Sequence, residues 1–243
     1  MIKAACHVHS EWSYDGKWPL SKLVNQFGPR GYRVLLTTEH DRGFSEHRLL
    51  EYRRACAHAS SDQVLLIPGI EYSDANNVVH ILVWGNVPFL GEGLATEEVL
   101  RGVKAANGIA VLAHPSRREA WKVYQHSWSD ALLGIEIWNR KSDGWAPGRR
   151  AIPLLRRTSL VPFVGLDFHT QRQFFPLAAE LELELPVTEE SVLTCLDHRR
   201  FRSTAFGMPV GYSGLEGWQA AAFHAAERCR RSLAGARRLF AAG

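Results

Sequence analysis

The chain begins with Ile2-Lys3-Ala4-Ala5-Cys6-His7-Val8-His9-Ser10, a short apolar run that ends in two histidines separated by one residue. Side chains alternate between the two faces of a β-strand, so His7 and His9 would point the same way and could bind one metal ion. An isolated pair of this kind is weak evidence. Its weight comes from the rest of the sequence, where further apolar runs also end in His, Asp or Glu.

These apolar runs and the segments between them predict an α/β fold. We expect buried strands over residues 2–8, 34–38, 64–70, 78–84, 109–113, 134–138 and 160–166, with a strand or extended arm over 181–185. Apolar residues at helical spacing predict helices over residues 20–27, 96–108, 147–157, 189–196 and about 214–241. The alternation implies a mainly parallel sheet covered by helices, and the length suits one domain over residues 1–243.

Nine side chains of types that bind metals lie at or near these strand ends: His7, His9, Asp15, His40, Glu71, His80, His114, Asp167 and His169. Each alone has a structural explanation. His80 could be a hydrogen-bonded strand histidine, Asp15 part of a turn, and Glu71 an ion-pair partner. Burying polar groups costs free energy unless they are paired, so five strands that end in this way favour a shared metal site.

The ligand types indicate two to three divalent transition metals, namely Zn²⁺, Mn²⁺ or Fe. Six histidines argue against Mg²⁺ or Ca²⁺ alone, since these ions prefer oxygen. Glu71 could bridge two ions, which would hold a hydroxide for attack on phosphorus. The four cysteines form no Cys-x-x-Cys pair, which argues against a thiolate zinc site or a disulfide framework.

The charge pattern excludes little. The net charge is +4 and the isoelectric point about 9.0, so a solvated basic surface is favoured over a nucleic-acid tract. No apolar run approaches about 18 residues and no leader is evident, so we expect a cytoplasmic protein without a membrane partner. The C-terminal helix should dock on the body with a basic outer face. Its apolar stripe is Leu215, Trp218, Ala222, Ala226, Cys229, Leu233, Ala236 and Phe240; its arginines are Arg228, Arg230, Arg231, Arg237 and Arg238.

The order of these motifs resembles the PHP (polymerase and histidinol phosphatase) family of metal-dependent phosphoesterases. The resemblance covers roughly two thirds of the chain. The matching segments are His7-Val8-His9-Ser10, Tyr14-Asp15-Gly16, Thr38-Glu39-His40-Asp41, Pro68-Gly69-Ile70-Glu71 with His80-Ile81-Leu82, Ala113-His114-Pro115 and Gly165-Leu166-Asp167-Phe168-His169. Two positions depart from the pattern. Asp15 stands where some members have His. Glu39 stands where Asp is usual, and because this residue would lie behind the ligands, the difference affects the fine properties of the metal site and not its existence.

The resemblance implies a distorted (β/α)7 TIM-like barrel of the PHP type with a trinuclear site. It assigns the metals as follows: His7, His9, Glu71 and Asp167 to the first, Glu71, His80 and His114 to the second, and Asp15, His40 and His169 to the third. The expected activity is hydrolysis of a phosphate ester of a small molecule or nucleotide by a metal-bound hydroxide. Candidate phosphate-binding residues are Arg117, Arg140 and Arg172, each of which could equally be a surface charge.

Two alternatives remain open from the sequence. A nuclease acting on short RNA or DNA could stack bases on Trp121, Trp128, Trp138 or Trp145, although helix packing explains these residues equally well. A metal- and phosphate-binding module without turnover is the second alternative, against which the intact ligand set argues. The oligomeric state is left open by the sequence.

Overall fold

β1 (Ile2–Val8) is the strand around which the first sheet is arranged. It pairs in parallel with β2 (Val34–Thr37) and antiparallel with β10 (Leu177–Leu181). The sheet has six strands in the order β12-β11-β10-β1-β2-β4. Its remaining strands are β4 (Leu65–Ile67), β11 (Phe201–Ala205) and β12 (Met208–Pro209). The computed structural model describes residues 1–211, 215 and 217–240.

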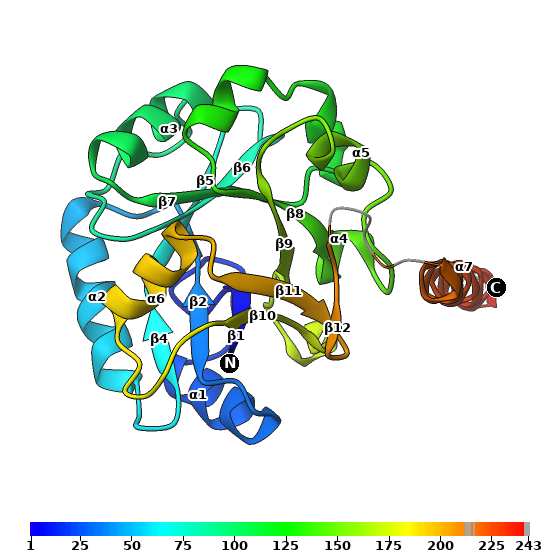
Figure 1. The fold of residues 1–243 in the computed structure, drawn as a ribbon, viewed down its shortest axis with the longest axis horizontal. Coiled ribbons are helices and arrows are strands. Elements are labelled where there is room, and N and C mark those ends of the chain that lie inside the picture. Colours follow the sequence, from blue (N-terminus) through cyan, green and yellow to red (C-terminus); the bar gives the residue numbers. More distant parts are fainter. Residues whose placement is uncertain (212–214, 216, 241–243) are drawn as a thin grey trace.

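A second six-stranded sheet has the order β3-β5-β6-β7-β8-β9. Its strands are β3 (Glu39–His40), β5 (Gly69–Ser73), β6 (His80–Trp84), β7 (Ile109–Leu112), β8 (Gly134–Asn139) and β9 (Val161–Gly165). The strands lie in the interior and most of the helices lie outside them (Figure 1). The prediction of an α/β fold is therefore confirmed at this level.

The predicted closed (β/α)7 TIM-like barrel is not what the hydrogen bonds show, because both sheets are open. Thr38 separates β2 from β3, and Pro68, which has no N–H to continue a ladder, separates β4 from β5. Three backbone hydrogen bonds connect the segment after β9 to β1: Leu166 N to Cys6 O at 2.9 Å, Phe168 N to His7 O at 3.0 Å and His9 N to Phe168 O at 2.8 Å. The sheets thus touch along β1 without forming one continuous ladder.

The prediction of a mainly parallel sheet is wrong. Among the described strands, five pairs are parallel and five are antiparallel. β6 runs antiparallel to both of its neighbours, β5 and β7. Only residues 74–79 join β5 to β6, whereas a parallel crossover needs about a dozen residues or more. This spacing was visible in the sequence.

The helices lie on the outside of the sheets except α6 (Glu189–Asp197), which packs against the inner apolar cluster of the strands. They are α1 (Leu20–Phe27), α2 (Glu46–Ala59), α3 (Thr96–Ala105), α4 (Arg140–Asp143), α5 (Ala151–Leu155), α6 (Glu189–Asp197) and α7 (Gly217–Phe240), with 3-10 turns at Gly28–Arg30, Arg117–Lys122, His126–Asp130 and Gln171–Gln173. α1 and α6 lie where they were expected. The helix expected over 147–157 shrinks to α5. α2 was not predicted, because it buries only Leu49, Tyr52 and Cys56.

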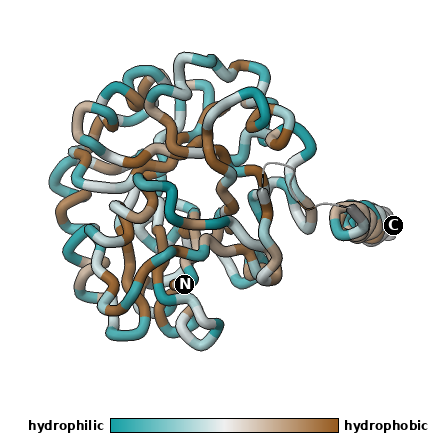
Figure 2. The backbone as a smooth tube through the Cα atoms, in the orientation of Figure 1, coloured by the Kyte–Doolittle hydropathy of each residue, from teal (hydrophilic) through white to brown (hydrophobic). Residues whose placement is uncertain are grey.

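Hydrophobic residues concentrate along the strands (Figure 2). One apolar cluster lies between the strands of both sheets and helices α1, α2, α3 and α5, and a smaller cluster lies inside, between the strands and α6. This division leaves the ends of several strands free to carry polar groups. No helix of the described residues is long and apolar enough to cross a membrane.

α7 lies at the side of the body and is seen end-on in Figure 1. Phe223 packs against Trp138, with ring centroids 5.3 Å apart, and against Phe206 at 5.4 Å. The expected contact stripe is wrong, because Trp218 is 78% exposed and Leu233 is 65% exposed. The helix contacts the body instead through the face that carries Phe223, which is displaced by about one residue from the expected stripe. Arg237, Arg238, Ala236 and Phe240 lie outside the residues whose side chains the structure describes, as do the expected helix ends at 214 and 241.

Candidate metal centre

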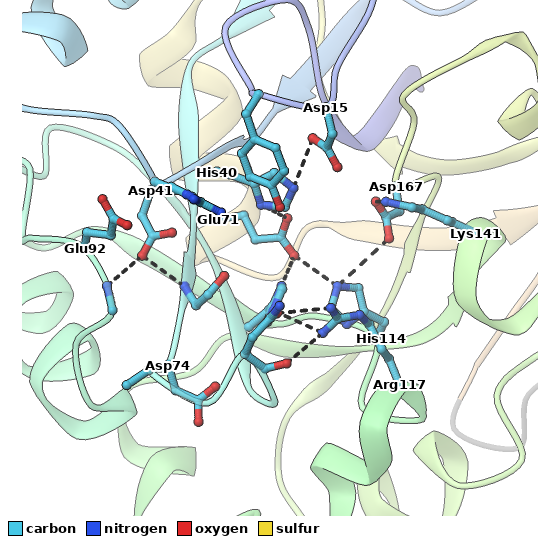
Figure 3. Close-up of a pocket in the computed structure, with 17 residues that line it drawn as sticks. Asp15, His40, Asp41, Glu71, Asp74, Glu92, His114, Arg117, Lys141 and Asp167 are labelled. Carbon is cyan, nitrogen blue, oxygen red and sulfur yellow. Dashed lines mark hydrogen bonds and ion pairs between the residues drawn. The ribbon is translucent and has the colours of Figure 1, made fainter.

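All nine predicted ligands converge at one end of the strands. They come from β1 and the residues after it (His7, His9, Asp15), from β3, β5 and β6 (His40, Glu71, His80), and from the segments after β7 and β9 (His114, Asp167, His169). Eight of the nine are buried, and the side chain of Asp15 is 34% exposed. Figure 3 shows several of them pointing toward a common centre.

The carboxylate of Glu71 lies at the middle of this cluster. Its Oε2 is 3.3 Å from His7 Nε2 and 3.2 Å from His9 Nε2. Its Oε1 is 2.7 Å from His80 Nδ1 and 3.0 Å from His114 Nε2. The two oxygens therefore face different pairs of histidines, which is the geometry that a carboxylate bridging two ions requires.

A second acidic group completes the cluster on the solvent side. Asp15 places one oxygen 3.4 Å from His40 Nε2 and the other 3.0 Å from His169 Nε2. Asp167 links the residues around Asp15 to those around Glu71. Its Oδ1 is 3.6 Å from His9 Nε2 and 3.3 Å from His169 Nδ1. The donor atoms fall into overlapping groups of three or four within 4.8 Å of one another, and donors on one ion lie at most about 4.4 Å apart.

The hydrogen bonds of His9 test whether these residues fit a metal. Ser13 Oγ donates to Glu39 Oε2 at 2.6 Å, so His9 Nδ1 donates to Ser13 Oγ at 3.1 Å. Burial and the nearby His169 hold the pKa of His9 well below its usual value. Its Nε2 is then an unprotonated acceptor, buried without a hydrogen-bond partner and aimed at a Glu71 oxygen that also has none. Two facing acceptors need a cation between them, so the residues fit a metal.

Buried carboxylates behind the cluster orient its ligands. Glu136 Oε1 accepts from His7 Nδ1 at 2.9 Å, and Glu136 Oε2 accepts from His114 N at 2.8 Å and from Asn139 Nδ2 at 2.9 Å. Glu39 does not face the cluster. It accepts hydrogen bonds from Ser10 and Ser13 instead, which explains how a Glu is accommodated at this position. Such partners fix the tautomer and orientation of metal-binding histidines.

Electrostatics keep the acidic residues of the cluster ionised. Burial raises the pKa of Glu71, but His7 and His80 outweigh it and hold that pKa well below its usual value. His7 and Lys141 do the same for the pKa of Asp167. Burial lowers the pKa of His7, but Glu136 and Glu71 outweigh it and raise that pKa well above its usual value. A metal and a proton therefore compete for the same position beside His7.

Three of the nine residues have left-handed backbone conformations, which L-residues rarely adopt. The φ angles are 60° at His7, 25° at His114 and 48° at Asp167. Such conformations cost about 1–3 kcal/mol each and persist only where surrounding structure enforces them. They concentrate here at the strand ends that carry the cluster.

A cavity of about 340 Å³ opens over the cluster. Arg117 lines it and is held by Asn77, with Nη2 3.0 Å from Asn77 Oδ1. Arg140 and Arg172 do not line it: Arg140 donates to the Arg172 carbonyl at 3.3 Å and lies over the ring of Phe175. Of the three predicted phosphate-binding residues, only Arg117 is therefore brought to the cluster.

Three further residues of the site, Lys141, Glu136 and Tyr14, were not predicted from the sequence as functional residues. Lys141 lines the cavity and places Nζ 3.1 Å from Asp167 Oδ1. It is the neighbour of Arg140, and spacing alone could not say which of two adjacent cations faces the site. Tyr14 is 65% exposed at the mouth and stacks on His40, with ring centroids 5.0 Å apart. Glu136 lies inside a predicted strand, where the apolar pattern gave no reason to single it out.

Comparison with known proteins shows similarity of fold. No family model and no curated protein sequence matches the chain. A two-domain protein from Bacteroides vulgatus, described as containing a predicted PHP-like metal-dependent phosphoesterase, superposes with a TM-score of 0.64 at 18% identity. The match covers 84% of this chain and 64% of that protein, so the chain spans less than two thirds of its length.

Two further solved structures share the fold. PsfC from Pseudomonas syringae has a TM-score of 0.61 at 15% identity, over 95% of this chain and 98% of that one. The lesion-specific endonuclease EndoQ from Pyrococcus furiosus has a TM-score of 0.56 at 16% identity, over 81% of this chain and 56% of that one. With nine histidine and carboxylate side chains gathered at its strand ends, the chain has the fold of the PHP-like metal-dependent phosphoesterases that its sequence motifs resemble.

Proposed function

We propose that this protein is a metal-dependent phosphoesterase that hydrolyses a phosphate ester of a small molecule or nucleotide. The observation that carries the proposal is the meeting of two kinds of groups in one cavity. Glu71 and the histidines around it face inward, while Arg117 and Lys141 stand at the rim. A metal cluster beside two cationic side chains suits an anionic phosphate ester better than a neutral ester or amide.

The nine residues would hold two to three divalent transition metals. His7, His9 and Asp167 would hold one ion, His80 and His114 a second, and Asp15, His40 and His169 the third, and Glu71 would be a ligand shared by the first two. Metals bound there would lower the pKa of water and polarise the phosphoryl group. The donor set supports Zn²⁺, Mn²⁺ or Fe, since it is rich in imidazole and has no thiolate.

The protein's own groups bind and orient the phosphate. Arg117 is fixed by Asn77, and Nη1 lies 3.1 Å from His80 Nε2, so its guanidinium is presented at a set position. Lys141 Nζ sits beside Asp167 and lines the same cavity. A phosphate between them would receive charge-assisted hydrogen bonds from two directions, which would fix its orientation over the cluster. Glu136 would keep His7 in the tautomer whose Nε2 faces the cluster.

Activity should be tested on metal-replete protein with phosphomonoesters, phosphodiesters, cyclic phosphates and short oligonucleotides. We expect turnover of at least one class, abolished by His9→Ala or Asp167→Ala with the circular dichroism spectrum retained. His47→Ala is the matched control, because that side chain is 80% exposed on α2. If the wild type turns over nothing yet binds phosphate, the module without turnover replaces the enzyme. If it neither hydrolyses nor binds any member, the phosphoester proposal is abandoned.

A nuclease is the second candidate, and one observation favours it. The exposed ring of Tyr14 stands at the cavity mouth with the guanidinium of Arg42 5.5 Å from its centre, a surface on which a base could stack. Trp128 and Trp138 are buried and cannot serve this purpose. Tyr14→Ala should impair cleavage of oligonucleotides more than that of simple phosphomonoesters. Equal effects on both would remove the support for a nuclease.

A further inference from the structure

A second cavity, of about 510 Å³, lies between α7 and the segment that joins α4 to α5. None of the nine candidate metal ligands lines it. Its cationic lining consists of Arg149 and Arg150 from the body and Arg228, Arg231 and His224 from α7. We call this cavity the arginine pocket.

The positive charge of the arginine pocket is only partly neutralised. Glu227, which lines it, already accepts hydrogen bonds from Arg230, Arg231 and the backbone of Trp145. Arg149 and Arg228 form no ion pair with any residue that the structure describes. Burial and these two arginines lower the pKa of His224, as expected where cations crowd together.

The second carboxylate of the pocket does not compensate for this charge. Asp143 is buried and accepts a hydrogen bond from Asn139 N at 2.8 Å. Burial raises its pKa to about 7, so near neutral pH it carries less than a full negative charge. Arg149 and Arg228 thus remain available to an anion from outside.

Two glycines allow the wall of the pocket to form. A Cβ at Gly144 would lie 2.5–2.6 Å from the Glu227 carboxylate, and a Cβ at Gly148 would lie 2.7 Å from Ser116 Oγ. The Ser116 hydroxyl is buried beside the Asp143 carboxylate, so the pocket presents its guanidinium groups to a ligand.

The pocket is a neighbour of the candidate metal centre but opens elsewhere. Ser116 lines the pocket while the adjacent Arg117 lines the cavity over the metal ligands. In the same way Ser142 lines the pocket while Lys141 lines that cavity. The two spaces lie on opposite sides of these two segments, so a ligand in the pocket would not occupy the metal centre.

We propose that the arginine pocket binds a phosphate group. Guanidinium groups match phosphate oxygens in a two-pronged geometry. The volume is within the range of ligand pockets and exceeds what a phosphate alone needs. The phosphate can come from free inorganic phosphate or from the backbone of a single-stranded oligonucleotide. The site is independent of the phosphoesterase proposal, because its occupancy does not require hydrolysis.

Binding should be measured by titration calorimetry on the metal-loaded full chain, with inorganic phosphate in one arm and a short single-stranded oligonucleotide in the other. The test variant is Arg149→Ala with Arg228→Ala. The matched control is Arg54→Ala with Arg101→Ala, which removes the same charge from exposed positions of α2 and α3. Cys229 is exposed and follows Arg228, whereas Cys6, Cys56 and Cys195 are buried, so a fluorophore on Cys229 reports locally.

We expect a saturable fluorescence change in at least one arm and affinity at least tenfold lower in the test variant than in the control. If the oligonucleotide is the ligand, the slope of log affinity against log salt should fall by about 1.4, or 0.7 for each arginine. Equal losses in the test and control variants, or saturable binding by neither ligand, would overturn the proposal. Because Arg149 and Arg228 are exposed, an unchanged melting temperature should confirm that both variants fold.

Discussion

Replacing Glu136 with Gln removes one proton acceptor without changing side-chain volume. The Glu136 carboxylate accepts three hydrogen bonds, from His7 Nδ1, His114 N and Asn139 Nδ2, at 2.8–2.9 Å. An amide can keep only some of them. If its NH₂ faces His7, the imidazole must move its proton to Nε2, the atom that faces Glu71. If the NH₂ group faces away from His7, it lies against the N–H groups of His114 and Asn139, and these two donors lose their acceptor.

Either orientation should weaken metal binding. Loss of a partner behind a metal-binding histidine typically costs a factor of about 10–100 in metal affinity, or about 1.4–2.8 kcal/mol. Affinity should be measured by competition with a chromophoric chelator. Glu97→Gln is the control, since that carboxylate accepts from Gln125 and Trp128 far from the cluster. Gly165→Ala should reproduce the defect, because an added methyl would overlap Glu136 Oε1. Affinity within twofold of wild type in Glu136→Gln would refute the assigned role.

Three further outcomes are expected. Metal-replete protein should contain two to three ions per chain by elemental analysis, and Glu71→Ala should lose two together; at most one ion in the wild type would contradict a multinuclear centre. Arg117→Ala and Lys141→Ala should each raise KM more than they lower kcat, by the equivalent of about 1.5–3 kcal/mol, and a pure kcat effect would argue against phosphate binding. Burial raises the pKa of Asp143 from 3.8 to about 7, so between these values the unfolded chain has lost a proton that the folded one keeps, and stability falls as pH rises. The free energy of unfolding of Asp143→Asn, measured in urea, should therefore exceed that of the wild type by up to about 4 kcal/mol at pH 8 and equal it near pH 3. The same difference at both pH values would exclude titration of Asp143 as the cause.

That these side chains gather was predictable because most of them follow an apolar run, and the end of a strand can be recognised in a sequence; Asp15, in the loop after β1, and His80, the first residue of β6, are the exceptions. His7 with His9, and Asp167 with His169, also carried the two-residue spacing of a strand. Lys141 was not predictable, because it and Arg140 are adjacent and only the turn of α4 decides which one faces the cavity.

The errors in the fold have a similar origin. Sequence patterns indicate strands better than their pairing, so the antiparallel course of β5 and β6 was overlooked although the short connection between them required it. On α7 the apolar stripe through Trp218 and Leu233 predicted the buried face, but packing of Phe223 against Trp138 and Phe206 set the rotation of the helix. Tertiary contacts outweighed helical periodicity there.

The left-handed backbone at His7, His114 and Asp167 implies a conflict between folding and function. Glycine adopts such angles without penalty, so natural selection for stability alone would favour glycine at all three positions. Histidine and aspartate persist there only if what their side chains do is worth more than the conformational cost. In the metal-free protein, His114→Gly and Asp167→Gly should accordingly melt at higher temperatures than His114→Ala and Asp167→Ala, because both changes remove the side chain and only glycine relieves the backbone. The positions at which glycine would relieve backbone strain are thus the positions at which a substitution would abolish metal binding.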